Sequence, residues 1–386
     1  DAKIIFEALI KLDPNNLDYL FTLADLARVQ KDWDSSIEYY LEGYRANSLA
    51  INGLEQALQI SLTTNNFEKA EEICELFLED DPQNIKIIET LRDLTIFSKK
   101  YDIALDMVNR IEKIQGTSAE LSIQKSALHE ELNQNNEALT VMYTALENDS
   151  INIMVLHRLV SLLLDQEKNE KATLINQKII KHFPDDSRGY INDAVIAMSN
   201  QKPEEAILAL SAHVGKFPQD FTVQYLLGTA YYQFKDYGNA EIYLSQALTI
   251  FPDSRNTKHN LAMIYDTTKE WVKSDKLYMD LIATDSTDAQ AFNNYAYSLI
   301  ERGEDVEFSL ELAKQAIRLV PDSAPYLDTI GWIYFKMDQI DEAIKYIQNS
   351  LNIDSENSTI QDHLDYILKI KAELDTHKDP QVEKRD

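Results

Sequence analysis

Apolar and polar residues recur along this chain with the spacing of amphipathic helices. Within residues 221–254, the segment FTVQYLLGTAYYQF carries apolar side chains at helical spacing, and NAEIYLSQALTIF repeats that spacing. The polar stretch KDYG separates the two segments, and PDS follows the second. Proline cannot continue a helix, and the aspartate and serine after it can cap the next one. The pattern therefore predicts two helices joined by a short turn.

This pair of helices recurs with a period of 34 residues. The prolines that end the pairs are separated by multiples of this period, except that one extra residue precedes the last proline. They are Pro14, Pro82, Pro184, Pro218, Pro252 and Pro321. A small residue also recurs at one place of the second helix: Ala2, Ser36, Ala70, Ala104, Ala138, Ala172, Ala206, Ala240, Ser274, Ser309 and Ala343. Only a small side chain fits where two helix backbones approach closely. We therefore expect the helices to cross at this residue.

The repeat resembles the tetratricopeptide repeat (TPR) family over nearly the whole chain. The residues that carry the resemblance in unit 221–254 are Leu227, Gly228, Tyr231, Ala240, Leu244, Ala247 and Pro252. Those in unit 324–357 are Leu327, Ile330, Gly331, Tyr334, Ala343, Ile347 and Ser350. The resemblance implies an all-α fold, a right-handed α-solenoid superhelix of about ten helix-turn-helix repeats with a C-terminal capping helix.

The period also gives the expected boundaries of the repeats. We expect a single solenoid domain at 1–374 and a polar tail at 375–386. The domain divides into a half unit at 1–16, full units at 17–50, 51–84, 85–118, 119–152, 153–186, 187–220, 221–254, 255–288, 289–323 and 324–357, and a capping helix at 358–374. Because the chain starts within a helical pattern, we also expect the native beginning to lie outside this sequence.

The charge of the chain limits the classes of partner. Acidic side chains number 65 against 37 basic ones, which gives a net charge of −28. Such a field repels phosphate backbones and anionic lipid headgroups, so the sequence argues against binding to nucleic acid or to a membrane surface. No apolar stretch approaches the roughly 20 residues that a membrane span needs. The acidic field favours protein partners, including partners with a basic segment.

Motifs of catalysis and metal binding are absent from the sequence. The stretch HEELN at 129–133 has Asn133 where a zinc-protease helix requires its second histidine. The seven histidines are scattered, and the single cysteine, Cys74, falls at an apolar place of its repeat. The sequence therefore predicts no enzyme, no metal site, no cofactor and a buried Cys74 thiol.

Candidate binding residues follow from the resemblance, because the first helix of each repeat lines the concave face in this family. In the early units the inward places hold mainly acidic residues: Asp18, Asp25, Glu55, Glu89, Asp93, Glu120, Glu130 and Glu131. In the later units the predicted partner-binding residues are Asn192, Tyr225, Tyr232, Asn260, Asn293, Asn294, Tyr297, Trp332 and Phe335.

Each of these residue types has a use in binding and a structural alternative. An asparagine amide can pair with any peptide backbone, and Asn192, Asn260 and Asn294 share one place of their units, although Leu226 interrupts the row. Tyrosine and tryptophan are efficient interface anchors, and acidic residues steer basic segments. The alternatives are helix caps for the asparagines, packing between helices for the rings, and a solvated face for the acids.

The leading hypothesis is a non-catalytic scaffold that binds a partner peptide or helix in the concave groove, alone or as a subunit of a larger assembly. Two alternatives are a structural protein that assembles with itself as a homo-oligomer, and the targeting arm of a larger enzyme. The later units match the bacterial style of the repeat best. By analogy, this favours a bacterial protein of the cell envelope, on the periplasmic side, over a cytoplasmic one.

Overall fold

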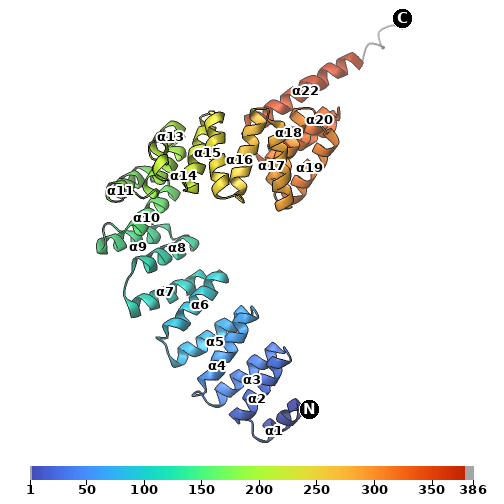
Figure 1. Ribbon diagram of the computed structural model, residues 1–386. Helices are drawn as coiled ribbons and strands as arrows, with labels where there is room; N and C mark the ends of the chain where they lie inside the picture. Colours follow the sequence, from blue (N-terminus) through green and yellow to red (C-terminus); the bar gives the residue numbers. More distant parts are fainter. Residues whose placement is uncertain (1, 379–386) are drawn as a thin grey trace. The chain divides into compact units, whose positions relative to one another are not determined.

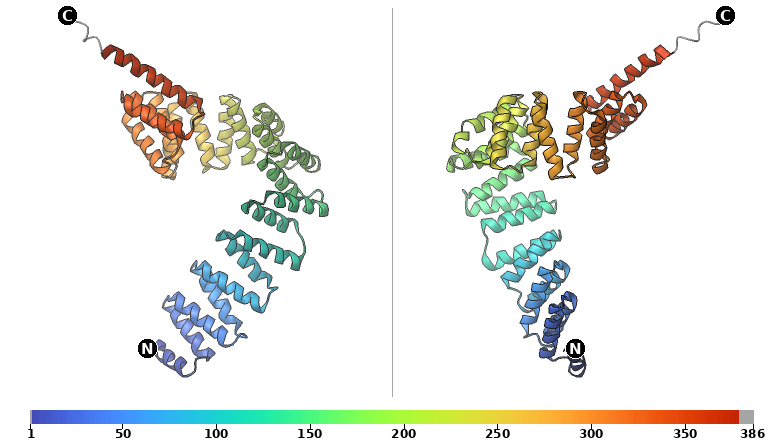
Figure 2. Two further views of the ribbon diagram at one scale, coloured as in Figure 1. Left: turned by 180° about the vertical axis from the view of Figure 1, so that it is seen from behind. Right: turned by 45° about the vertical axis from the view of Figure 1, so that its right-hand side comes forward.

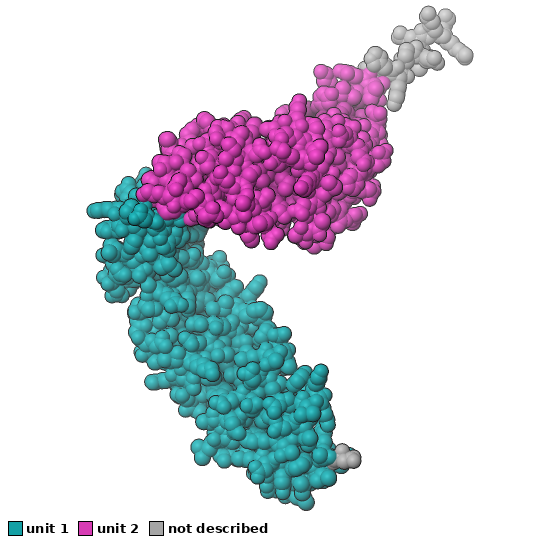
Figure 3. Space-filling model, in the orientation of Figure 1, with its two compact units in different colours: residues 1–189 teal, residues 190–386 magenta. Residues whose placement is uncertain are grey.

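The computed structural model describes residues 2–378, and these residues form α-helices without a β-strand. The helices follow one another as pairs with short connections (Figure 1). The prediction of an all-α solenoid of helix pairs is confirmed. The chain divides into two compact units, residues 1–189 and 190–386, which are described separately (Figure 3).

The first unit contains eleven helices among its described residues. Their bounds are α1 (Ala2–Leu12), α2 (Leu17–Val29), α3 (Trp33–Ala46), α4 (Ile51–Thr63), α5 (Phe67–Asp80), α6 (Ile85–Phe97), α7 (Tyr101–Gln115), α8 (Ala119–Glu131), α9 (Asn135–Asn148), α10 (Ile153–Asp165) and α11 (Asn169–His182). Aliphatic side chains such as Leu54, Ile73 and Ile88 form the core between successive helices. Cys74 is fully buried there, and burial raises the pKa of its thiol to about 12, so the prediction of a buried thiol is confirmed.

The second unit continues the same arrangement. Its helices are α12 (Arg188–Ser199), which begins at the boundary, α13 (Pro203–Ser211), the 3-10 helix η1 (Val214–Lys216), α14 (Phe221–Gln233), α15 (Tyr237–Ile250), α16 (Arg255–Thr267), α17 (Trp271–Thr284), α18 (Ala289–Glu301), α19 (Val306–Leu319), α20 (Ala324–Lys336), α21 (Ile340–Ile353) and α22 (Ser358–Lys378). Helix α14 packs against α15, and α15 packs against α16 in turn. Both further views show this stacking of neighbouring helices (Figure 2).

The second helix of the predicted unit 187–220 is interrupted. Helix α13 has 9 residues, whereas α15, α17 and α19 have 14 each. The chain leaves the α-helix after Ser211, and Gly215 lies within the 3-10 turn that follows. Glycine is unfavourable in the interior of an α-helix. In addition, the ring of His213 stacks on Tyr190 with a centroid distance of 3.8 Å. Both features favour the break.

The small residues lie where the two helices of a repeat cross. All of them from Ser36 to Ala343 are completely buried, whereas Ala2 is exposed. The hydroxyls of Ser36 and Ser309 donate 2.8 Å hydrogen bonds to the carbonyls of Ala24 and Ala296, which belong to the partner helices. The predicted close crossing is confirmed from Ser36 onward.

The turn within each repeat reverses the chain through a residue with positive φ, and the turn before α19 contains two, Gly303 and Asp305. Lys31, Lys235 and Lys269 are examples, with φ of 60°, 65° and 62°. In the turn after α14, the N–H of Lys235 donates to the carbonyl of Tyr232, and the N–H of Asp236 donates to that of Tyr231. This is the Schellman arrangement, which satisfies the last carbonyls of the helix. The Asp236 side chain then caps α15, so one short turn ends one helix and begins the next.

The C-terminal helix α22 covers the last helix pair. Its side chains Ile360, Leu364 and Ile367 are buried against α20 and α21. The helix continues to Lys378, four residues beyond the predicted end at 374, and runs past the last pair (Figure 1). The remainder of the predicted tail, 379–386, lies outside the described residues. Among residues 2–378, no helix combines the length and apolarity of a membrane span.

Candidate functional site

The first helices of three successive repeats form a pocket of about 250 Å³ in the second unit. Helix α14 contributes Tyr232, helix α16 contributes Met263, Asp266 and Thr267, and helix α18 contributes Asn293, Asn294 and Tyr297. Tyr278 of α17 completes the lining. We refer to this site as the groove pocket. Four of the nine predicted partner-binding residues, Tyr232, Asn293, Asn294 and Tyr297, therefore lie together.

The carboxylate of Asp266 is held by two neutral hydroxyl groups. Tyr278 donates to Oδ2 at 2.8 Å, and Ser298 donates to Oδ1 at 2.8 Å. Tyr278 is only 1% exposed. Burial, followed by the neighbouring Asp266 charge, raises the pKa of Tyr278 far above its usual value. The hydroxyl group therefore stays protonated, and it fixes the orientation of the carboxylate.

The asparagine pair in the pocket is incompletely satisfied. Asn293 is 6% exposed, and its Nδ2 donates to Oδ1 of Asn294 over 3.4 Å. Its own Oδ1 is buried and accepts no hydrogen bond from the described residues. A buried acceptor without a donor typically costs about 1–3 kcal/mol. A bound donor would recover that energy, so the pocket favours a ligand that carries hydrogen-bond donors.

The tyrosine rings of the pocket present a surface to solvent. Tyr297 belongs to α18, the first helix of its repeat, and is 39% exposed. Tyr232 is partly buried and lies 6.0 Å from Tyr237 between ring centroids. Burial raises the pKa of both tyrosines, so both hydroxyl groups are neutral near pH 7. The two rings provide apolar contact area beside the Asp266 carboxylate.

The other predicted amide residues lie outside the groove pocket. Asn192 in α12 is buried, with 5% exposure. Asn260 in α16 places Nδ2 3.5 Å from both the Tyr225 hydroxyl and Thr229 Oγ1. The Tyr225 ring stacks on Phe221 with a centroid distance of 5.7 Å. These three predicted residues make contacts within the protein, and their role in partner binding stays a prediction.

Trp332 and Phe335 lie on α20 and contact the capping helix α22. The Trp332 ring stacks on His363 at a centroid distance of 4.5 Å, and Phe335 meets Tyr366 edge-on at 5.6 Å. Trp332 Nε1 also donates to the Glu301 carboxylate at 2.7 Å. The structure does not bring these two rings into the groove pocket, and it gives both a packing contact.

An ion pair connects α22 with α20 beside this aromatic cluster. Nδ1 of His363 lies 2.9 Å from Oδ2 of Asp328. The hydrogen bond to Asp328 raises the pKa of His363, and the charges of Asp328, Glu301 and Asp362 act in the same direction. The protonated histidine therefore contributes to the docking of α22.

Models of known protein families match several of the repeats described above. A tetratricopeptide repeat family model matches residues 1–51 and 193–255, and a second tetratricopeptide repeat model matches residues 324–357. The chain therefore contains tetratricopeptide repeats.

Relatives of this TPR protein match parts of its length. A TPR repeat-containing protein of Pseudomonas aeruginosa is 25% identical over 108 residues, which cover 28% of this chain and 18% of the relative. The type IV pilus assembly protein PilF of the same bacterium is 29% identical over 136 residues, which cover 35% of this chain and 54% of PilF. The chain thus spans about half or less of the length of these two relatives.

A solved structure agrees in fold. The crystal structure of a tetratricopeptide repeat protein from Parabacteroides merdae superposes with a TM-score of 0.52 at 15% sequence identity. The match covers 64% of this chain and 98% of that chain. At this identity the likeness concerns the fold alone.

Four lining residues of the pocket were not predicted from the sequence, Met263, Asp266, Thr267 and Tyr278, and Asp266 is the charged one among them. It occupies the twelfth place of unit 255–288, which is one of the inward places. The sequence pattern places acidic residues mainly in the early units, and rings and amides in the later ones. The position of Asp266 in the repeat was the available signal.

The acidic stripe of the first unit is partly neutralised within this TPR protein. Asp25 accepts hydrogen bonds from Arg28 at 2.8 Å and from the Tyr40 hydroxyl at 2.7 Å. Glu130 forms an ion pair with Arg158. These two acids therefore have partners in the same unit.

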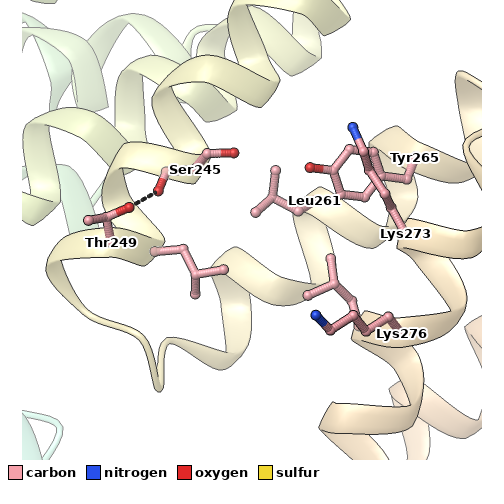
Figure 4. Close-up of a pocket in the computed structure, with 8 residues that line it drawn as sticks. Ser245, Thr249, Leu261, Tyr265, Lys273 and Lys276 are labelled. Atoms are coloured by element: carbon pink, nitrogen blue, oxygen red, sulfur yellow. Dashed lines mark hydrogen bonds between the residues drawn. The ribbon is translucent and has the colours of Figure 1, made fainter.

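A second pocket, of about 320 Å³, lies between α15, α16 and α17 (Figure 4). Lys273 lies over the Tyr265 ring, 4.7 Å from its centroid, and pairs with Glu241 at 3.0 Å. On the opposite side, the Thr249 hydroxyl donates to the Ser245 carbonyl (Figure 4). Lys273 and Thr249 are therefore already paired within the protein, and Lys276 also lines this pocket.

No group of three or more histidine, cysteine, aspartate or glutamate side chains within residues 2–378 is arranged to hold a metal ion.

Proposed function

We propose that this TPR protein is a non-catalytic interaction scaffold whose groove pocket binds a segment of a partner protein. Members of the family generally act as protein-interaction scaffolds. The observation that carries the proposal is the convergence of Tyr232, Asn293, Asn294 and Tyr297 from two first helices on one pocket. The buried, unpartnered Oδ1 of Asn293 supports a ligand that supplies a donor.

The dimensions of the pocket favour a peptide that inserts one side chain. A pocket of about 250 Å³ accommodates a single large side chain, while the rest of an extended peptide lies along the inner helices. Asparagine amides pair with a peptide backbone independently of its sequence, and tyrosine rings supply contact area with few rotors to fix. The name of one relative refers to pilus assembly. This supports a role for the chain as a subunit of a larger assembly.

The proposal is tested with a displayed library of random peptides, selected on the purified chain. Selected peptides carry a fluorescent label, and anisotropy gives their Kd. Exchanging both Tyr232 and Tyr297 for alanine should raise Kd by about tenfold or more, because central aromatic anchors typically contribute about 2 kcal/mol or more.

The matched control is Tyr143→Ala, which removes an exposed tyrosine from α9 in the first unit. This variant should leave Kd unchanged. A library that yields no specific peptide, or peptides that bind the double alanine variant as tightly as the wild type, would overturn the proposal. Light scattering on the same sample tests self-assembly, which is the principal competing role.

A further inference from the structure

The groove pocket contains a carboxylate that no cation neutralises. Each oxygen of Asp266 accepts a hydrogen bond from a neutral hydroxyl, of Tyr278 or of Ser298. Among residues 2–378, no lysine, arginine or histidine forms an ion pair with Asp266. A carboxylate has about four lone-pair positions, and two hydroxyl donors leave the others for a ligand. The charge of the site is therefore complementary to a cation.

A second acceptor lies in the same pocket. Asn293 is more than nine-tenths buried, lines the pocket, and has the unpartnered Oδ1 described above. A cationic side chain carries several N–H donors, three on lysine and five on arginine. Such a group has enough donors for both Asp266 and Asn293, whereas a ligand with a single donor has not.

The walls suit the rest of a long basic side chain. Met263, Tyr232 and Tyr297 line the pocket with apolar surface. The methylene groups of lysine and arginine pack on such surfaces, and aromatic faces attract cations within about 6 Å.

The surrounding charges add to this preference. Burial raises the pKa of Tyr297, and the negative charges of Glu301 on α18 and Asp328 on α20 raise it further. Both carboxylates therefore lie close enough to Tyr297 to contribute to the negative potential at the pocket. Arg302 forms ion pairs with Asp275 at 2.7 Å and with Glu304 at 3.1 Å. The net charge of −28 extends the field over the whole molecule.

We propose that the groove pocket selects a basic side chain, arginine or lysine, from the bound peptide, with Asp266 as the residue that recognises its charge. This inference rests on the proposed function, and it adds the chemistry of the side chain that enters the pocket.

The test changes the ligand first. In the peptides selected from the random library, arginine is replaced by citrulline, which is neutral and nearly the same shape, and lysine by acetyl-lysine. For the wild type, one such replacement should raise Kd by about tenfold, as expected for a charge-assisted contact. Because the protein is unaltered, this arm does not depend on the folding of a variant.

The second arm changes the protein. Asp266→Asn keeps an oxygen that accepts from a hydroxyl, and circular dichroism checks its helicity. In this variant the citrulline replacement should change Kd by less than about twofold, because the charge that distinguishes the two peptides is gone. The control Asp253→Asn removes an exposed carboxylate from the turn before α16 and should keep the wild-type discrimination.

The outcomes separate the two claims. Peptides that bind through Tyr232 and Tyr297 but tolerate citrulline and acetyl-lysine would overturn the basic preference and leave the scaffold proposal standing. Discrimination that persists in Asp266→Asn would also overturn the assignment to Asp266. A chain that binds no peptide at all would overturn both.

Discussion

Two glycines at equivalent places of their repeats, Gly228 and Gly331, lie where the first and second helices cross. A Cβ on Gly228 would come within 2.6 Å of Leu244 Cγ and 2.9 Å of its backbone nitrogen. A Cβ on Gly331 would meet Ile347 Cγ1 at 2.5 Å. These contacts are shorter than a packed core tolerates, so the repeat needs glycine here for close approach.

Gly228→Val should therefore destabilise the second unit by about 1–3 kcal/mol, since overpacking forces the helices apart. The matched control is Gly238→Val in α15, where an added Cβ meets only Asp236 Oδ1, at 3.8 Å. This control should change stability by no more than about 0.5 kcal/mol. Urea unfolding followed by circular dichroism measures both variants, and equal effects would contradict the crossing geometry.

The sequence predicted the close crossing because small residues recur with the period of the repeat. It did not predict Asp266 as a site residue, although the residue occupies an inward place. The environment of Asp266 depends on Tyr278 and Ser298, which come from two other helices. Such a cluster depends on packing between repeats, which periodicity alone does not specify.

At the scale of the helix, the turn within each repeat shows a similar limit. The short polar turn was predictable from KDYG and its equivalents, but the left-handed residue was not, because it is Lys, Asn, Glu or Gln in most repeats. A left-handed conformation normally favours glycine. In the turn between α18 and α19, a glycine does occupy this place, Gly303. The Schellman hydrogen bonds and the cap that follows hold the other residues in place.

The capping helix was predicted, whereas its contacts with Trp332 and Phe335 were not. Both residues occupy inward places of α20, and α22 packs against that helix, so each ring gains a packing partner. A tryptophan at an inward place has the same sequence signature whether it contacts a partner or a following helix. Only the position of α22 distinguishes the two.

The docking of α22 should depend on pH through His363. The Asp328 carboxylate raises the pKa of His363 above its unfolded value of about 6.5. The stabilisation is therefore fully present below that unfolded pKa, and it is lost as the pH rises through the raised folded pKa. The protection factors of the α22 amides, which remove the intrinsic rise of the exchange rate with pH, should therefore fall across that interval.

The variant Asp328→Asn provides the check. NMR titration of His363 should give a lower pKa in this variant than in the wild type, because the hydrogen bond to a carboxylate is lost. The protection factors of the α22 amides should then vary less with pH in Asp328→Asn than in the wild type. An unchanged pKa of His363 would show that Asp328 does not stabilise the protonated form.

At the scale of the whole molecule, the repeats explain why the fold is predictable and the domain division is not. Each repeat contacts mainly its neighbours, so the period specifies the helices throughout. Because the contacts are local, the period does not tell which repeats group together into a compact unit. The structure has two such units, and the expectation of one solenoid domain at 1–374 stays a prediction.

The net charge of the chain acts over its full length. Because its net charge is −28, the molecule attracts basic segments of other proteins before contact, and salt weakens this attraction. Charge of this kind increases the association rate more than the affinity. Selectivity then depends on a local site, and the groove pocket supplies one.

The most direct test of the scaffold proposal is hydrogen exchange of the full chain with and without a peptide selected from the random library. We expect slower exchange in α14, α16 and α18, the helices that carry most of the groove pocket lining, with little change in α15. Slowing confined to the second helices of the repeats, or to the first unit alone, would contradict the proposal.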